Sequence, residues 1–307
     1  MTTVSVAYVG THGVHLDHLT DINAGSPGTT NVTVNRPYPF FAQIFQLQTN
    51  QISNYNAVQV TAERRARGLS FLASYTYSHA LDDNTNSPGA VVNPYNIQGD
   101  YGNSDLNVPN RFVASATYSL PFQTGGKLKP VLQGWQLNAI LQYFDGIPFS
   151  VTAANGVGDG LTPRAQLVPG QGNGTLPSDK RSITQWFNTS AFVSIPLTGT
   201  LANGQWGNSG RNILQGPGTK NVDFSVFKNF QLAESKVLQF RAEFFNLFNT
   251  PQFNNPSATA PPPAATSTTL VPNITPGAAY GTISSAGSPT TFQRISREIQ
   301  LAAKFTF

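Results

Sequence analysis

The chain has 307 residues and no cysteine, only 10% of its residues are charged, and its formal net charge is +4. A typical soluble domain has about 25% charged residues, so this surface must be polar without being ionic, and disulfides and thiolate metal sites are excluded. The basic residues are scattered, which argues against nucleic-acid binding, and the lack of a run of about 18 apolar residues excludes a transmembrane helix.

The first residues have the pattern of a strand that is already under way. Val4, Val6 and Tyr8 alternate with small polar residues, and the basic start and continuous apolar segment of a signal peptide are missing. Residues 11–21, "THGVHLDHLTD", then place three histidines three residues apart, with two aspartates nearby. Such residues can bind a metal, but a spacing of three alternates faces in a strand. We therefore expect a polar hairpin or loop here and no metal site.

Four segments in the middle of the chain alternate between apolar and polar side chains, at residues 56–65, 69–79, 111–122 and 135–143. This period of two is typical of strands with one apolar face. Most of the stripes run about 10 to 12 residues, whereas strands in globular proteins average about 5 to 6 and membrane-spanning strands need about 9 to 11. The length of the stripes favours strands that cross a membrane.

The second half of the chain repeats this pattern at residues 222–226, at 238–244 and in the terminal "REIQLAAKFTF", residues 297–307. The charged residues on the polar faces are Glu63, Arg241, Glu243, Glu298 and Lys304. In a barrel these faces line the interior, and we expect the charges to pair across neighbouring strands rather than to guide a solute.

Three long stretches between the strands are rich in Gly, Pro and Asn, at residues 80–109, 154–219 and 250–290. We expect these stretches to be mostly loops, and the last contains a low-complexity segment. Loops this long are uncommon in compact soluble domains, but long extracellular loops are normal in outer-membrane barrels.

One loop contains residues that a hydrolase or a cation site would use. His79 lies near Asp82 and Asp83, but no G-x-S-x-G motif is present. Asp82, Asn84 and Asn86 match the first three ligand positions of a calcium loop, but the Gly and Glu that are most diagnostic of such a loop are missing. We expect an exposed loop, no catalytic residue, no metal site and no cofactor.

Alternation alone does not separate a membrane barrel from a soluble β-sandwich, whose apolar face is its core. Aromatic residues gather near the ends of several stripes, as in the girdles of outer-membrane barrels: these are Tyr75, Tyr77, Tyr118, Phe122, Trp135, Tyr143, Phe305 and Phe307. Strand length and aromatic placement favour the barrel. A soluble or secreted β-rich binding or adhesion protein is the alternative, and a barrel enzyme is the third hypothesis.

Five segments, taken in order, resemble the carboxy-terminal β-barrel of TonB-dependent outer-membrane receptors, in particular the Oar-like group of acidobacterial type. They are "NYNAVQVTAERRARGLSFLASYTYSHALDD", "GDYGNSDLNVPNRFVASATYSLPF", "GWQLNAILQYFDGIPFSV", "FRAEFFNLFNTPQFNNP" and the terminal "AAKFTF". The resemblance covers most of the chain from about Tyr55 to Phe307. One departure is Asn110, where the family often has a His before the Arg.

The resemblance implies an all-β, antiparallel transmembrane barrel that closes around an amino-terminal plug and takes up a solute when the TonB complex pulls on that plug. Residues 1–307 contain no counterpart of the plug or of a signal peptide, and about ten long strands, whereas plugged transporters have about 22. We therefore expect an open partial barrel with long extracellular loops, a fragment that is inactive alone and not an enzyme, and that transports an unknown solute only within a whole receptor.

The expected location is the outer membrane. The expected partners are outer-membrane lipid, the barrel-assembly machinery and, through the missing plug, the TonB complex, with no nucleic acid. Alternate apolar residues that end in Phe resemble the signal that the assembly machinery recognises. In this chain the residues of that signal are Ile299, Leu301, Ala303, Phe305 and Phe307.

Overall fold

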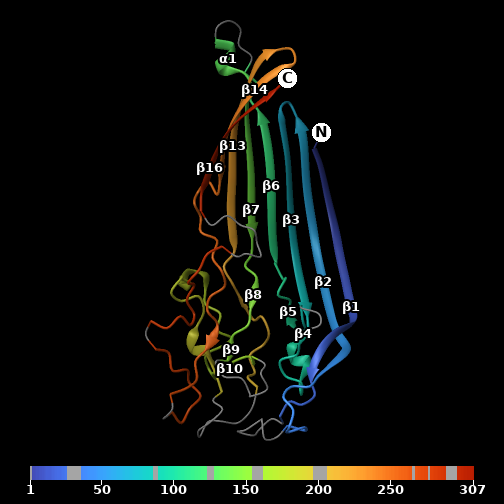
Figure 1. The fold of residues 1–307 in the computed structure, drawn as a ribbon, viewed down its shortest axis with the longest axis vertical. Helices are drawn as coiled ribbons and strands as arrows, with labels where there is room; N and C mark the ends of the chain where they lie inside the picture. Colours follow the sequence, from blue (N-terminus) through green and yellow to red (C-terminus); the bar gives the residue numbers. More distant parts are fainter. Residues whose placement is uncertain are drawn as a thin grey trace.

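The computed structural model describes residues 2–25, 36–85, 89–122, 128–153, 162–195, 206–264, 267–275, 277–287 and 296–307. Its main body is one curved sheet of ten strands in the order β16-β14-β13-β7-β6-β3-β2-β1-β4, with β5 paired to β3 (Figure 1). Eight of these strands are long: β1 (Thr2–Asp21), β2 (Phe45–Ala66), β3 (Leu69–Asp82), β6 (Asn110–Ser119), β7 (Trp135–Phe144), β13 (Thr219–Ala233), β14 (Lys236–Phe245) and β16 (Glu298–Thr306).

The long strands pair with one another in antiparallel fashion, as the sequence predicts, and only the two-residue β4 pairs with β1 in parallel among the described strands of this sheet. The remaining two members of the sheet, β4 (Gly89–Ala90) and β5 (Gly102–Asn103), have two residues each, so eight rather than ten strands are long. Among the described residues β1 and β16 do not pair with each other. The sheet is therefore open, which agrees with the predicted partial barrel.

At the end of the sheet that holds both termini, the β2–β3 and β13–β14 turns are short, and the β6–β7 turn is longer (Figure 1). Arg67 and Gly68 alone connect β2 to β3, with positive φ at both residues, which matches the twist of a tight hairpin. A side chain at Gly68 would meet the carbonyl oxygen of Ser119 at 2.8 Å. The three long loop stretches, residues 80–109, 154–219 and 250–290, leave from the opposite end. Since outer-membrane barrels have short periplasmic turns and long extracellular loops, the loop end is the extracellular one.

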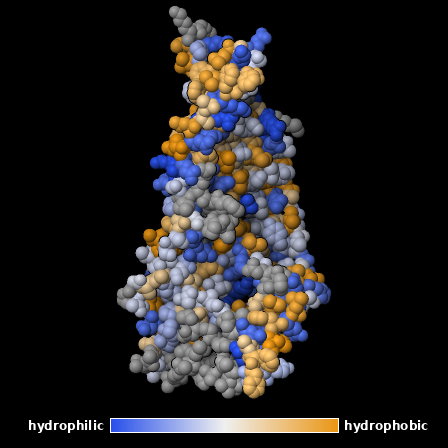
Figure 2. All heavy atoms as spheres, in the orientation of Figure 1, coloured by the Kyte–Doolittle hydropathy of each residue, from blue (hydrophilic) through white to orange (hydrophobic). Residues whose placement is uncertain are grey.

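The apolar face of the sheet is exposed. On this face Tyr77 is 56% exposed, Leu141 41% and Phe240 48%, and Figure 2 shows many apolar side chains on the surface of the strand region. In a β-sandwich these side chains would form the core between two sheets. The exposed stripe therefore excludes the soluble sandwich and faces outward, as in a barrel whose outer surface meets lipid.

Tyrosines mark the extracellular edge of this apolar stripe. The hydroxyl of Tyr8 donates to Asn56 at 2.6 Å, and that of Tyr75 donates to Asn110 at 2.6 Å. On β7, Tyr143 at this level and Trp135 near the other end are separated by eight residues, about 26 Å of extended strand. That distance is close to the apolar band of about 25 Å in outer-membrane barrels.

One lysine interrupts the outward stripe. Lys228 lies opposite Trp135 and Phe240, on the face that carries the apolar residues, yet it is only 6% exposed. Its ammonium donates to the carbonyl of Val131 at 3.0 Å and to that of Gln133, and lies 5.0 Å from the Trp135 ring. The turn between β6 and β7, which contains helix α1 (Lys129–Leu132), supplies those carbonyls.

The long loops gather at the extracellular end of the sheet (Figure 1), and their described parts form a cap. The cap contains short strand pairs formed by β8 (Pro148–Phe149) with β12 (Leu214–Gln215), β9 (Thr152–Ala153) with β15 (Thr259–Ala260) and β10 (Gln166–Leu167) with β11 (Phe192–Val193). The other described helices are single turns: η1 (Ile97–Asp100), η3 (Ser178–Lys180) and η4 (Thr189–Ala191). None of the described helices is long and apolar enough to span a membrane.

Candidate functional site

The cap has a hydrophobic core of its own. Phe187 is 1% exposed and its ring packs against those of Phe149, Phe192 and Tyr280, with centroids 5.4 to 5.9 Å apart. Burial raises the pKa of the Tyr280 hydroxyl above its usual value. The predicted loop stretches 154–219 and 250–290 thus contribute to a packed unit, although regular structure in their described parts is limited to short strands and single turns.

A buried arginine ties the cap to the loop that follows β3. Arg164 forms an ion pair with Asp100, and both side chains are less than 10% exposed. The same guanidinium donates to the carbonyls of Gly99 at 2.9 Å and Ser209 at 2.8 Å. The guanidinium and the carboxylate are therefore partnered, as buried charges must be.

A second arginine makes a similar connection nearer to the sheet. Arg211 forms an ion pair with Asp82 at the end of β3 and donates to the Asp82 carbonyl at 2.7 Å. It also donates to the Thr85 hydroxyl at 2.9 Å and to Asp105 at 3.3 Å. The two arginines hold the loops of the extracellular end in one arrangement relative to the sheet.

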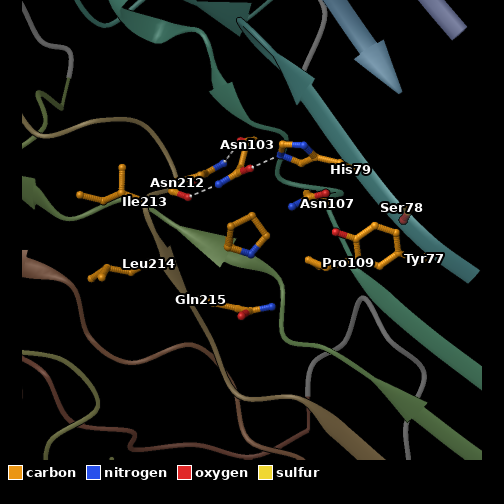
Figure 3. Close-up of a pocket in the computed structure, with 11 residues that line it drawn as sticks. Tyr77, Ser78, His79, Asn103, Asn107, Pro109, Asn212, Ile213, Leu214 and Gln215 are labelled. Carbon is orange, nitrogen blue, oxygen red and sulfur yellow. Dashed lines mark hydrogen bonds between the residues drawn. The ribbon is translucent and has the colours of Figure 1, made fainter. Parts of the chain in front are cut away.

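A polar pocket of about 350 Å³ lies where the cap meets β3 (Figure 3). Its walls come from β3, from the loop between β5 and β6, and from the start of β8 and β12. The lining residues are Tyr77, Ser78, His79, Asn103, Asn107, Pro109, Pro148, Asn212, Ile213, Leu214 and Gln215. None of them is an Asp, Glu, Lys or Arg.

Two asparagines fix one wall of the pocket, because the side-chain amide of each donates to the backbone carbonyl of the other. Asn103 donates to the carbonyl of Asn212 at 3.0 Å, and Asn212 donates to the carbonyl of Asn103 at 2.7 Å (Figure 3). His79 Nε2 lies 3.0 Å from Asn103 Oδ1. On the other side of the pocket, Asn107 Oδ1 accepts from the backbone N–H of Ala80 at 2.8 Å. The pocket is thus held in shape by contacts between segments distant in sequence.

The hydrolase hypothesis receives no geometric support around His79. The neighbouring Ser78 points to the other face of the strand, where its hydroxyl donates to the carbonyl of Val108 at 2.9 Å. Asp82 is paired with Arg211, and Asp83 accepts from the backbone N–H of Ile52 at 2.7 Å. Burial raises the pKa of Asp83, and that backbone N–H opposes the shift. The described residues therefore bring no serine, histidine and carboxylate together here.

The histidine-rich segment near the start is a strand, so the predicted hairpin or loop is wrong. Strand β1 continues to Asp21 through register shifts between Gly13 and His18, and His15 takes a positive φ of 58° there. His12 contacts Asn54 at 2.6 Å. Within the described part of the chain, no group of three or more His, Cys, Asp or Glu lies close enough to hold a metal ion.

The charged residues predicted for the interior do lie on the face opposite to the apolar stripe. In the register, however, Arg241 faces Ala302, Glu243 faces Gln300 and Lys304 faces Gln239, all uncharged. Arg241 instead donates to Gln239 on its own strand at 2.5 Å, and its guanidinium lies 4.8 Å from the ring of Phe227 on β13. The expected pairing of opposite charges directly across strands is absent at these three described positions.

The carboxy-terminal strand places its predicted signal residues on the outward face. Ile299, Leu301, Ala303 and Phe305 lie opposite apolar residues of β14. Phe307 follows the strand, is 87% exposed, and stacks on Phe305 with ring centroids 5.8 Å apart. These residues form one continuous apolar row at the edge of the sheet.

Sequence reasoning did not identify Arg164, Arg211 or the amide wall of the pocket. The sequence gives only a weak indication of these ion pairs. An arginine in a stretch with few charged residues has few nearby carboxylates, so it must pair with a distant one if it is buried. Because Arg164 and Asp100 are 64 residues apart and Arg211 and Asp82 are 129 apart, no local pattern links them.

Comparison with known proteins gives one result about the family. Residues 1–300 match a family model described as an outer membrane beta barrel domain. Neither the curated proteins nor the solved structures contain a significant match to this chain.

Proposed function

The chain belongs to the outer membrane β-barrel domain family, and we propose that it forms part of the barrel wall of a TonB-dependent receptor of the Oar-like group. We propose that this receptor takes up a solute. The outer-membrane location and the lipid contact follow from the family. Uptake of a solute, its dependence on TonB and membership of the Oar-like group are proposals. They rest on the resemblance of five segments, taken in order, to such receptors.

The observation that carries this proposal is the braced cap at the extracellular end. A receptor needs a recognition surface that keeps its shape, and binding groups are commonly carried by loops that a rigid scaffold positions. Here a core around Phe187 and two ion pairs, from Arg164 and Arg211, hold the loops. The inward faces of the strands below are polar, as in a barrel interior that a solute or a plug contacts.

The proposed activity is binding and transport, without catalysis. It includes two protein partners: the barrel-assembly machinery, which would recognise the row from Ile299 to Phe307, and the TonB complex, which would act through a plug.

The test is uptake in cells that produce the protein in its natural context, compared with cells from which the segment for residues 1–307 is removed in frame. The probes are a labelled ferric siderophore, a labelled maltooligosaccharide and a labelled tetrapeptide, each with and without a protonophore. We expect at least one probe to accumulate only in the intact cells and only without the protonophore. Accumulation that depends on the chain but not on the proton gradient would indicate a passive channel instead.

A further inference from the structure

Two of the residues that line the pocket of Figure 3, Tyr77 and His79, come from the outward face of the sheet. Tyr77 and His79 lie on the face of β3 that also carries the outward residues Phe71 and Tyr75. Tyr75 belongs to the tyrosine level at the extracellular edge of the apolar stripe, through its bond to Asn110. The pocket lies directly beyond that level, where a barrel surface leaves the hydrocarbon and meets the head groups of the outer leaflet.

The chemistry of the lining selects an uncharged ligand with many hydroxyls. Side-chain amides and a phenol hydroxyl both donate and accept hydrogen bonds, which matches a hydroxyl group that does the same. No Asp, Glu, Lys or Arg lines the pocket, so apart from His79 it lacks the charged partners that a phosphate or an ammonium requires. Pro109, Pro148 and Ile213 add apolar surface, on which the C–H face of a sugar ring can pack.

Two groups at the pocket have no other partner among the described residues. The oxygen of Asn107 accepts from Ala80, which orients the amide and leaves its nitrogen as the available donor. The hydroxyl of Tyr77 makes no hydrogen bond to another described residue. In Figure 3 both the Asn107 nitrogen and the Tyr77 hydroxyl point toward the middle of the pocket.

We propose that this pocket binds a neutral sugar ring, with Tyr77 and Asn107 as ligand-contacting residues. The ring belongs either to a glycolipid of the outer leaflet or to a free saccharide, because the same hydroxyls occur in both. The volume of about 350 Å³ lies within the range of small-molecule sites. This proposal does not depend on TonB-driven uptake, since a barrel that transports nothing can still hold a sugar on its outer surface.

The experiment uses the full chain in its natural context, purified in a detergent without sugar groups, and measures binding by titration calorimetry. The soluble probes are the methyl glycosides of glucose, galactose, mannose and N-acetylglucosamine. The lipid probes are a monoglycosyl diacylglycerol bearing each of the same sugars and phosphatidylethanolamine with the same acyl chains. A glycolipid that binds more tightly than its methyl glycoside assigns the site to membrane sugar, and equal affinities assign it to free saccharide.

Two variants change the proposed contacts and one matched variant does not. Tyr77→Phe removes only the free hydroxyl, and Asn107→Asp keeps the acceptor for Ala80 while removing the free donor. Each is expected to weaken sugar binding about tenfold, the effect of one lost hydrogen bond to a ligand. Tyr75→Phe removes a hydroxyl two residues earlier on the same face of β3, outside the pocket. It is expected to leave the affinity for sugar unchanged.

The proposal is overturned if no glycoside and no glycolipid binds more tightly than phosphatidylethanolamine. It is also overturned if Tyr77→Phe and Asn107→Asp bind sugar as Tyr75→Phe does. Heat modifiability of each variant on a gel, compared with the unmodified protein, shows whether the barrel is folded. Uptake measured in the same variants keeps this result separate from the transport proposal.

Discussion

Arg211 and Asp82 are 129 residues apart in the sequence and form a largely buried ion pair, with side chains 11% and 10% exposed. The pair joins the end of β3 to the segment that leads into β12. Together with the Arg164–Asp100 pair, it holds the cap in place relative to the sheet.

Removing one partner of this pair should loosen the cap. Arg211→Ala leaves the Asp82 carboxylate without its charged partner, which costs about 3 kcal/mol when the pair is buried. We expect the cap to open about a hundredfold more often, measured as the rate of proteinase K cleavage in detergent. Arg65→Ala is the control, because its ion pair with Glu63 is exposed and such pairs contribute about 0 to 1 kcal/mol. Equal cleavage rates of Arg211→Ala and Arg65→Ala would contradict the role of Arg211 in holding the cap.

The core of the cap should be separable from the barrel. Phe187→Ala leaves a cavity between three aromatic rings and should cost about 3 to 5 kcal/mol of cap stability. Hydrogen–deuterium exchange should rise in residues 186–195 and 256–262 and stay unchanged in β3 and β7. Phe40→Ala, at a residue that is 97% exposed, is the matched control and should change exchange neither in the cap nor in the strands. Loss of protection throughout the strands would show that the cap and barrel fold as one unit.

A buried carboxyl near the cap should make local stability depend on pH. Burial raises the pKa of Asp83 above 3.8, and Asp100 and Asp82 add to this while the Ile52 N–H and Arg211 oppose it. The folded state therefore holds the proton more tightly, so local stability falls as pH rises from 3.8 to the folded pKa and then levels off.

Asp83→Asn removes the cost of burying that charge while keeping an oxygen for the Ile52 N–H. We expect the Ile52 amide to exchange more slowly in the variant at pH 7, with the difference shrinking as pH is lowered toward 3.8. Exchange rates are corrected for the intrinsic effect of pH. Asp179→Asn, at an exposed carboxyl in η3, controls for the loss of one charge. If the difference in Ile52 exchange between the variant and the unmodified protein grew as the pH was lowered, the predicted effect of Asp83 on local stability would be wrong.

The two faces of the terminal strand should respond differently to a charge. Leu301→Arg puts a guanidinium on the outward face, at a residue that is 78% exposed, and a charge at the bilayer midplane costs about 2 to 4 kcal/mol. Gln300→Arg places the same group on the polar face of the same strand. We expect unfolding by urea in lipid vesicles to show a large loss for the first variant and a small one for the second. Equal losses would mean that the face assignment is wrong.

The final residue should matter for assembly more than for stability. Phe307→Ser removes the last ring of the apolar row while leaving the β14–β16 ladder intact, since the strand ends at Thr306. We expect less protein in the outer-membrane fraction at equal expression, because recognition by the assembly machinery is weakened. Lys304→Gln, on the polar face, should not reduce this amount. A Phe307→Ser protein that reaches the membrane at the normal level would remove Phe307 from the proposed signal.

The long strands could be predicted because their information is local. In β7, the alternation from Trp135 to Tyr143 is written in consecutive residues, and the requirement for one lipid-facing and one polar face reproduces it in space. The strand at 11–21 was missed because β-bulges break the alternation there, and His15 at positive φ shifts the register of the histidines that follow.

The cap could not be predicted, since its core joins side chains from widely separated segments. Phe149, Phe187, Leu214 and Tyr280 lie in stretches without periodicity, each contributing one or two buried residues. The pocket has the same origin: Asn212 reaches Asn103 across 109 residues. Only the folded arrangement reveals which of the many asparagines in these loops meet.

The capped ammonium of Lys228 has a consequence for how this barrel can vary. The turn between β6 and β7 is longer than the other described connections at its end of the sheet, and its carbonyls at Val131 and Gln133 cover a charge that would otherwise face lipid. Shortening that turn would strip the cover from the lysine, and replacing the lysine would leave two inward-turned carbonyls without their donor. The length of the turn and the identity of residue 228 are therefore coupled: we expect a change in either one alone to destabilise the barrel, and a change in both together to be tolerated.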